Sequence, residues 1–309
     1  MSQHPDRHLP VGVDPARIVA RVGLISDTHM PERCPAWPPG LFEVLRGVDL
    51  LLHAGDVGEL WVLDQLGALA PVIAVHGNDD GADAWRELPY RQVVAVAGVR
   101  LVLTHGHYPE RGEEMASHAI DDWGPKLDRL ASFGASAGAR VVVSGHTHIP
   151  VAHEHRGVLL VNPGAVAAGG STSRQLYRTV AILFVRDDGA LFVTHVDLAA
   201  LERPFVATVD WEAGFRAAAA HYEQSILAPD LAARWGRLRE IVVPFSREEL
   251  RPVIAVLARC ARRCWSGERE LVTVDDLVTE LARAVDLPTA LREQLVVAML
   301  PAAGEYNLR

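Results

Sequence analysis

Side chains that bind metal ions recur in five short motifs in the first half of the chain. Aspartate offers hard oxygen ligands and histidine a nitrogen ligand of intermediate softness, a mixture that suits manganese, iron, zinc or cobalt. A magnesium or calcium cage would rely mostly on oxygen. The residue types therefore predict a transition-metal site. The motifs are, in order, Asp27-Thr28-His29, Gly55-Asp56, Gly77-Asn78-Asp79-Asp80, His105-Gly106-His107 and Gly145-His146-Thr147-His148.

The spacing within these motifs favours convergence on one site. In an extended chain, alternate residues leave toward the same side, so the two ends of Asp-x-His or His-x-His can reach neighbouring metal ions. Glycines adjoin the ligands at Gly55, Gly77, Gly106 and Gly145. Glycine permits unusual φ values and a close backbone approach.

The elements that must position these motifs are short and apolar. Continuous apolar runs fit strands that are buried on both faces. Each of the first five runs ends at one of the motifs, and the carboxyl edge of an α/β sheet is where ligands bind. We therefore predict α/β layers from about residue 21 to 198, closing in a β-hairpin around an Asp-Gly turn. The predicted strands before the hairpin are 22–26, 49–53, 71–77, 100–106, 140–145 and 158–162.

The character of the sequence changes at about residue 203. Residues 211–227 are helix-like, apolar residues recur at helical spacing between Val253 and Cys264, and Thr273 with Asp276 resembles a capping box. Pro252 leaves the start of the middle helix open. We predict a catalytic domain over residues 21–202 and a mainly helical appendage over 203–309.

The motifs together resemble the calcineurin-like metallophosphoesterase superfamily, and in particular its YfcE-type small phosphodiesterase branch. The resemblance covers about residues 21 to 198 and implies two mixed β-sheets packed face to face and flanked by helices. The phrases that carry it are LISDTHMPE, HAGDVG, AVHGNDD, LTHGH, SGHTHIP and VNPGAV.

The resemblance also implies a ligand set, position by position. One metal ion would be held by Asp27, His29 and His148, and the other by Asn78, His105 and His146, with Asp56 between the two. A bridging hydroxide would then attack phosphorus while the metals offset charge on the phosphoryl oxygens. Two divalent ions are expected, manganese foremost, with iron, zinc, cobalt or nickel as alternatives.

Asp79 departs from the pattern of many phosphatases in the superfamily. Those phosphatases place a histidine after Gly-Asn, whereas the small diesterase branch commonly lacks it. We expect a carboxylate here to repel a dianionic monoester more than a diester. This favours a phosphodiesterase that uses Asp56, Asn78, Asp79 and Asp80, the last as a supporting carboxylate. A phosphomonoesterase, including a nucleic-acid-end phosphatase, and a protein-interaction scaffold of the same fold are the alternatives, although the complete ligand set argues against a scaffold.

Several other side chains have two interpretations. His107 could contact substrate or simply pack beside the ligands, and Arg174 could reach a phosphate or remain solvated. A local role is favoured for His53, and a surface position for His153 and His155. His76 fits a position on the same side as Asn78 and a plain polar residue at the sheet edge equally well. Asn162-Pro163-Gly164 fits a loop in the wall of the site or a plain turn. Cys260 and Cys264 fit core thiols better than a metal or redox pair.

Composition limits the partners. A net charge of −9 over 309 residues disfavours a stable complex with nucleic acid but is compatible with a small phosphorylated substrate, including a nucleotide. No apolar run approaches the roughly 20 residues of a membrane span, and the N-terminus lacks the apolar stretch of a secretion signal. With three cysteines and no disulfide framework, we expect a cytoplasmic protein. The amphipathic helices of the appendage must pack against the catalytic domain or a second copy of the chain, so a homo-oligomer is one expectation.

Overall fold

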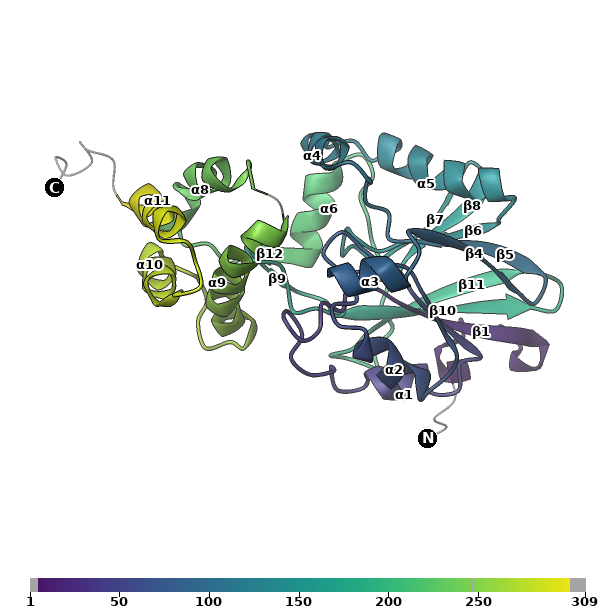
Figure 1. Cartoon of the computed structure of the whole chain (residues 1–309). Coiled ribbons are helices and arrows are strands. Elements are labelled where there is room, and N and C mark those ends of the chain that lie inside the picture. Colours follow the sequence, from purple (N-terminus) through teal and green to yellow (C-terminus); the bar gives the residue numbers. More distant parts are fainter. Residues whose placement is uncertain (1–4, 246, 301–309) are drawn as a thin grey trace. The chain divides into compact units, whose positions relative to one another are not determined.

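The computed structural model describes residues 5–245 and 247–300, and these fall into two compact units (Figure 1). The first unit contains the described residues up to 168 together with 175–222. The second contains 169–174 and the described residues from 223 onward. The boundary predicted at residues 202 and 203 stays a prediction about domain organisation.

Two five-stranded sheets form the centre of the first unit. Each sheet combines parallel and antiparallel pairs, as expected. The first sheet has the order β11 (Leu191–Asp197), β10 (Thr179–Arg186), β1 (Ile18–Ile25), β2 (Leu50–His53) and β3 (Val72–Ala74). The second has the order β4 (Arg91–Val96), β5 (Val99–Thr104), β6 (Val141–Val143), β8 (Val158–Asn162) and β7 (Val151–His155).

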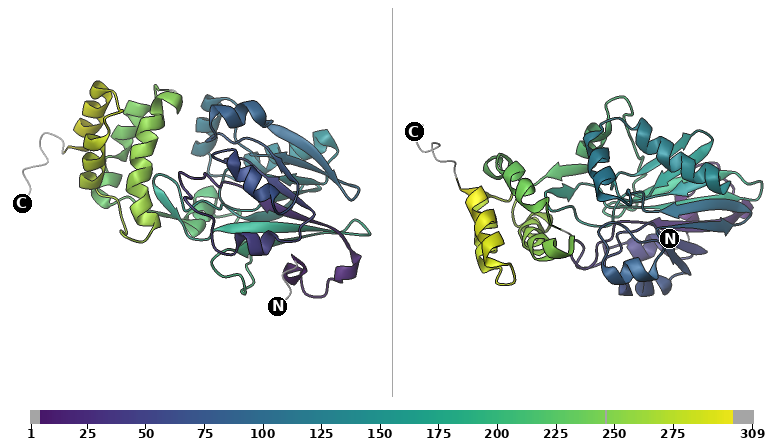
Figure 2. Two further views of the ribbon diagram at one scale, coloured as in Figure 1. Left: turned by 60° about the horizontal axis from the view of Figure 1, so that its bottom comes forward. Right: turned by 45° about the horizontal axis from the view of Figure 1, so that its top comes forward.

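Three layers of apolar packing hold these sheets and their helices together. Between the sheets, side chains such as Leu24 and Leu103 form one cluster. This burial explains why the strand sequences are apolar on both faces. Outside the first sheet, α1 (Leu41–Leu45) and α2 (Trp61–Gly67) pack against β1, β2 and β10. Outside the second sheet, α5 (Gly124–Ala137) and α6 (Phe215–Tyr222) cover β5, β6 and β8. The predicted four-layer architecture is confirmed, and Figure 2 shows it from two further sides.

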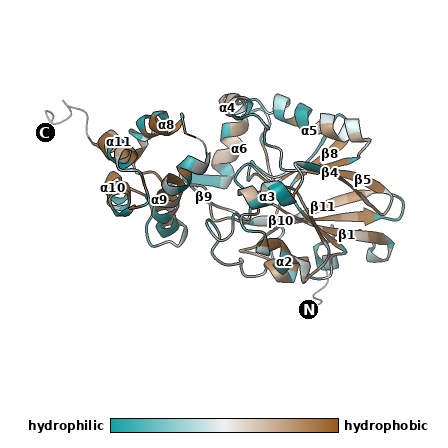
Figure 3. Ribbon diagram, viewed as in Figure 1, coloured by the Kyte–Doolittle hydropathy of each residue, from teal (hydrophilic) through white to brown (hydrophobic). Residues whose placement is uncertain are grey.

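The hydropathy of the helices and strands agrees with this layered arrangement. Figure 3 shows β1, β4 and β5 largely brown, whereas the short helix α3 (Ala82–Glu87) is teal. The helix α4 (Arg111–Ala119) follows β5, and two 3-10 turns, Pro5–His8 and Pro15–Arg17, precede β1.

The second unit is mainly helical and has its own core of leucine, valine and cysteine side chains. The predicted capping box at Thr273 and Asp276 is confirmed at the start of α10. Pro252 lies inside α9, five residues after its first residue, Arg247. The helices are α7 (Pro229–Ala232), α8 (Trp235–Val242), α9 (Arg247–Trp265), α10 (Val274–Arg283) and α11 (Thr289–Met299), and a short strand β12 (Glu223–Ser225) pairs with β9 (Ser173–Gln175).

The helix-like segment 211–227 is only partly helical. It forms α6 and then changes at Glu223 to strand β12, because Gln224 and its neighbours are used for pairing with β9. Within the described ranges, no helix combines the length and apolar composition that crossing a membrane requires.

Candidate metal centre

All five motifs lie directly after parallel strands. In the first sheet, Ile25, His53 and Ala74 are register partners at the ends of β1, β2 and β3. In the second sheet, Leu103 and Val143 are partners at the ends of β5 and β6. Because these strands end level with one another, the loops that follow them meet at the same edge.

Hydrogen bonds join the loops of the two sheets. The His105 Nδ1 lies 2.8 Å from the Ala54 carbonyl oxygen, which links β5 to β2. The backbone N–H of His146 donates to Asp27 Oδ2 at 3.0 Å, which links β6 to β1. These contacts fix the predicted ligands of one sheet against those of the other.

The backbone at the ligands is unusual. Residues other than glycine seldom adopt a positive φ, and a cluster of them is a common mark of a functional site. Five of the seven predicted ligands have a φ between 45° and 72°: Asp27, His29, Asp56, His146 and His148. The strand ends turn sharply there and aim Asp27, His29, Asp56 and His148 into a common space.

Glycine is needed where the loops approach most closely. A Cβ at Gly145 would lie 2.6 Å from Asp27 Oδ2, and one at Gly77 would collide with the carboxylate and backbone of Asp56. A side chain at either position would push the loops apart.

Ligand atoms converge in three overlapping groups, in each of which they lie within 4.8 Å of one another. The groups are Asp27 with His29 and His148, Asp27 with Asp56 and His105, and His29 with Asp56 and Asp79. Asp56 Oδ2 lies 3.4 Å from His29 Nε2 and 3.3 Å from His105 Nε2. One carboxylate oxygen is therefore shared between histidines that the resemblance assigns to different ions.

The two remaining predicted ligands lie close by. Asn78 Oδ1 is 3.1 Å from His105 Nε2. The His146 ring lies 5.1 Å from the His105 ring, centroid to centroid, but its Nε2 faces another element, described below. The donor set of carboxylates, an amide oxygen and imidazoles fits divalent transition-metal ions.

Burial and neighbouring charges set the protonation of these groups. Burial, together with the Arg33 guanidinium, lowers the pKa of His29 to about 3. Burial favours the neutral form of His105 as well, but the Asp56 carboxylate outweighs it and raises the pKa of that imidazole to about 10. Burial opposes ionisation of Asp56, yet His105 and His29 hold its pKa well below the usual value. The carboxylate form of Asp56 is thus favoured, and a histidine binds a metal ion only through a nitrogen that carries no proton.

Asp79 has a partner that the sequence argument missed. The Arg33 guanidinium lies 2.6 Å from Asp79 Oδ2 and 3.5 Å from His29 Nε2. We expected the Asp79 carboxylate to repel a dianionic monoester. The Arg33 guanidinium offsets part of that repulsion, because the pair as a whole is neutral. The only signal in the sequence was the position of Arg33, four residues after His29.

His146 also has an unforeseen partner. Its Nε2 lies 2.8 Å from Glu114 Oε1 on α4, and the same oxygen lies 2.7 Å from His118 Nε2. Glu114, His118 and His146 form a fourth group whose ligand atoms lie close together. Since 32 residues separate Glu114 from His146 and no motif contains Glu114, nothing in the sequence indicated this contact.

Asp80 supports the loops. Its two carboxylate oxygens accept the backbone N–H groups of Gly58 and Gly77, each at 2.8 Å. Burial, and then the Asp56 charge, raise the pKa of Asp80 to about 6. The turn after β8 is held in a similar way: Asn162 Nδ2 donates to the Gly145 carbonyl at 2.7 Å.

The histidines with two interpretations are placed as follows. His53 is buried and lies 3.0 Å from the Thr28 hydroxyl. His76 stacks on Trp85 at a centroid distance of 4.7 Å. His107 is buried 5.3 Å from the His105 ring, and neither of its ring nitrogens has a hydrogen-bond partner among the residues that the structure describes.

The remaining candidates lie in the second unit. Arg174 contacts Gln224 at 2.8 Å. Cys260 and Cys264 are buried free thiols in the helical core, and burial raises the pKa of Cys260 to about 12. They fit the core role that the sequence favoured, since a thiol with a raised pKa is a poor nucleophile.

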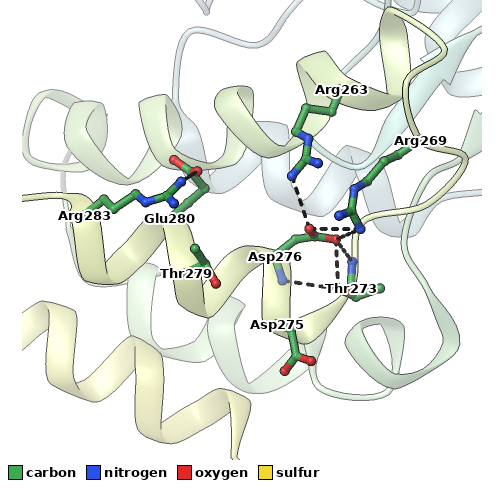
Figure 4. A pocket seen from close by; sticks show the side chains of 8 residues that line it. All are labelled: Arg263, Arg269, Thr273, Asp275, Asp276, Thr279, Glu280 and Arg283. Carbon is green, nitrogen blue, oxygen red and sulfur yellow. Dashed lines mark hydrogen bonds and ion pairs between the residues drawn. The ribbon is translucent and has the colours of Figure 1, made fainter.

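A polar pocket in the second unit has no excess charge with which to bind an anion. Figure 4 shows Asp276 between Arg263 and Arg269, and Glu280 beside Arg283. Three arginines and three carboxylates line the pocket together with two threonines. Their charges balance, so the metal centre of the first unit is the stronger candidate site.

Comparison with known proteins identifies the family. The model of the calcineurin-like phosphoesterase superfamily domain matches residues 21–188. The chain belongs to that superfamily. Two relatives, both described as probable metallophosphoesterases, come from Methanocaldococcus jannaschii (35% identical, 47% of this chain and 67% of the relative) and Methanothermobacter thermautotrophicus (36%, 47% and 76%). The chain is thus a metallophosphoesterase, a hydrolase of a metal-dependent family.

Further matches have lower identity. A phosphodiesterase of Methanocaldococcus jannaschii is 27% identical over 47% of this metallophosphoesterase and 82% of the relative. Among solved structures, vacuolar protein sorting 29 of Cryptosporidium parvum matches with a TM-score of 0.45 and 20% identity, over 58% of this chain and 98% of the other.

Proposed function

We propose that this metallophosphoesterase hydrolyses phosphodiester bonds in a small molecule or nucleotide with two divalent transition-metal ions, manganese foremost. Iron, zinc, cobalt and nickel fit the same donors. The observation that carries the proposal is the position of Asp56 Oδ2, within 3.4 Å of His29 Nε2 and 3.3 Å of His105 Nε2. A shared carboxylate oxygen is what a pair of neighbouring ions needs.

In this proposal the ligands divide as the resemblance implies. Asp27, His29 and His148 would hold one ion, and Asn78, His105 and His146 would hold the other, with Asp56 between the two sets. When bound, such ions lower the pKa of a water molecule and offset negative charge on phosphoryl oxygens.

The residues around the ligands orient the site. Asp56 Oδ1 accepts the backbone N–H of Asp79 at 2.7 Å, which keeps Asp56 Oδ2 directed at the histidines. Asn78 Nδ2 donates to Asp79 Oδ1 at 2.8 Å, so the Asn78 carbonyl oxygen is left to face His105. Asp80 ties the backbone of this loop to Gly58. Asp79 and Asp80 therefore act as positioning residues in the proposal.

The diester preference is supported by Asp79 and by the name of one relative. A diester carries one negative charge and a monoester two, so a carboxylate beside the centre disfavours the monoester. The Arg33 contact offsets part of this effect and keeps a phosphomonoesterase as the second candidate.

A substrate screen tests the proposal. Purified protein loaded with manganese is assayed against an aryl phosphodiester, cyclic nucleotides, phosphomonoesters and RNA ends. We expect turnover of diesters that is lost in Asp56→Asn and retained in Asp83→Asn, a matched change at a carboxylate that is 76% exposed on α3. Metal-loaded protein that turns over none of these substrates would refute the proposal.

A further inference from the structure

Glu114 places a carboxylate against the imidazole of a predicted metal ligand, His146. Glu114 and His118 are four residues apart on α4 and therefore share one face of that helix. Glu114 Oε1 lies between two imidazoles, 2.8 Å from His146 Nε2 and 2.7 Å from His118 Nε2. The Glu114 and His146 side chains are only 13% and 20% exposed, whereas that of His118 is 54% exposed.

This arrangement determines which nitrogen of His146 carries a proton. Glu114 Oε1 lies at hydrogen-bond distance, 2.8 Å, from His146 Nε2. A carboxylate oxygen accepts hydrogen bonds, so the contact places a proton on that imidazole nitrogen. When Nε2 carries the only ring proton, the lone pair of the ring lies on Nδ1.

We propose that Glu114 is a positioning residue of the metal centre: it accepts the Nε2–H of His146 and thereby reserves Nδ1 of that ring for a metal ion. The inference rests on the role proposed above for His146 as a ligand. A carboxylate that accepts the second N–H of a ligating histidine fixes its tautomer and orientation and raises its basicity.

The carboxylate is itself held in place. Glu114 Oε2 accepts the backbone N–H of Tyr108 at 2.7 Å. At the other end of α4, Lys126 Nζ donates to the carbonyls of Ser117 and Ile120, each at 3.0 Å. The helix is thus anchored on both sides of Glu114, and the His146 backbone is anchored separately to Asp27.

A different role has to be distinguished. One carboxylate and two histidines also form a donor set that zinc accepts. In that case Glu114, His118 and His146 would bind an ion of their own, and His118 would be as necessary as Glu114. In a positioning role, His118 is dispensable.

The first test reads the tautomer directly. Long-range ¹H–¹⁵N spectra of metal-free protein, with the His146 signals assigned by His146→Gln, are expected to show the proton on Nε2. Glu114→Ala should shift the ring toward the Nδ1–H form, while Glu114→Gln, which keeps a carbonyl acceptor, should retain Nε2–H. Alanine is a strong helix former, so α4 is expected to persist, and thermal denaturation of the metal-free variants checks this.

The second test measures metal binding. Calorimetric titration with Mn²⁺ should show binding of one ion weakened roughly 10- to 100-fold in Glu114→Ala and less in Glu114→Gln. Glu113→Ala, at the exposed neighbour on the same helix, is the matched control and should match the wild type. His118→Ala should keep the wild-type number of ions.

The outcomes separate the two proposals. An unchanged tautomer or an unchanged Mn²⁺ affinity in Glu114→Ala would overturn the role of Glu114, and so would loss of one ion in His118→Ala. Wild-type protein that binds no Mn²⁺ would instead defeat the proposed function, while the tautomer spectra would still decide the contact between Glu114 and His146.

Discussion

Replacing Asp79 or Arg33 changes the charge that a phosphate meets beside the metal centre. The two side chains form an ion pair at 2.6 Å and are only 18% and 14% exposed. Asp79→Asn removes a negative charge and leaves Arg33 without its ionic partner. Arg33→Gln does the reverse and removes the guanidinium that contacts the Asp79 carboxylate. The two substitutions should therefore shift substrate preference in opposite directions.

The size of the shift follows from one extra charge. A monoester dianion carries one more negative charge than a diester, so the ratio of their kcat/KM values reports a single charge–charge interaction. At an effective dielectric near 20 this interaction is about 4 kcal/mol at 4 Å and about 2 kcal/mol at 8 Å. Bound ions and partial exposure to water screen it further. We expect about 1.4 kcal/mol, which corresponds to about tenfold in the ratio.

Steady-state kinetics on an aryl monoester and the matching diester supply the measurement. Asp79→Asn should raise the ratio of monoester to diester kcat/KM by about tenfold, and Arg33→Gln should lower it by about tenfold. The double variant should return close to the wild-type ratio. Asp83→Asn and Arg86→Gln form the control, because this pair on α3 has a similar separation of 2.9 Å but is 76% and 68% exposed. Such exposed pairs contribute little.

Two results would refute the reasoning. If both single variants shift the ratio in the same direction, loop distortion and not charge controls the preference. If neither variant moves the ratio more than the α3 control pair does, Arg33 and Asp79 do not act on the incoming phosphate.

Three further predictions concern the metal centre, the core and the helical unit. Asp56→Ala should lower the rate of phosphodiester hydrolysis on the order of a hundredfold or more, since the bound ions supply most of the chemistry. Elemental analysis should find two ions in the wild type and fewer in the variant. Burial lowers the pKa of His195 from 6.5 to about 4, so between these pH values the unfolded chain binds a proton at this residue and the folded chain does not. The contribution of His195 to the free energy of unfolding is therefore fully present above pH 6.5 and is lost as the pH falls toward 4. Other buried histidines lose stability over the same window, so thermal denaturation should show a loss that is smaller by about 3 kcal/mol in His195→Gln than in the wild type. A chain that ends after Tyr222 should stay folded. One that ends after Glu202 should lose stability, because it lacks Tyr222, which packs with Trp123 and Leu127. Calorimetry of both truncated chains measures the difference.

The sequence by itself determined the fold class and the line-up of candidate ligands. Apolar runs predicted most of the strands of the two five-stranded sheets, since strands buried between layers must be apolar on both faces. The motifs predicted the site because the chain places each of them at the end of a parallel strand, where neighbouring loops must meet. Strands β4 and β7 were missed, because each alternates exposed with buried residues at the edge of its sheet and lacks a continuous apolar run.

Only the tertiary structure decided how charge is arranged around those ligands. Arg33 sits beside Asp79 and Glu114 beside His146, and each contact joins residues more than 30 positions apart. The types and spacing of residues carry little information about such pairs, because their partners come from loops and a helix whose approach depends on packing. Strand periodicity is a local property and can be read along the chain. The electrostatic potential at a site depends on every charge that lies near it, whichever part of the chain carries that charge. It can therefore be determined only from the folded structure.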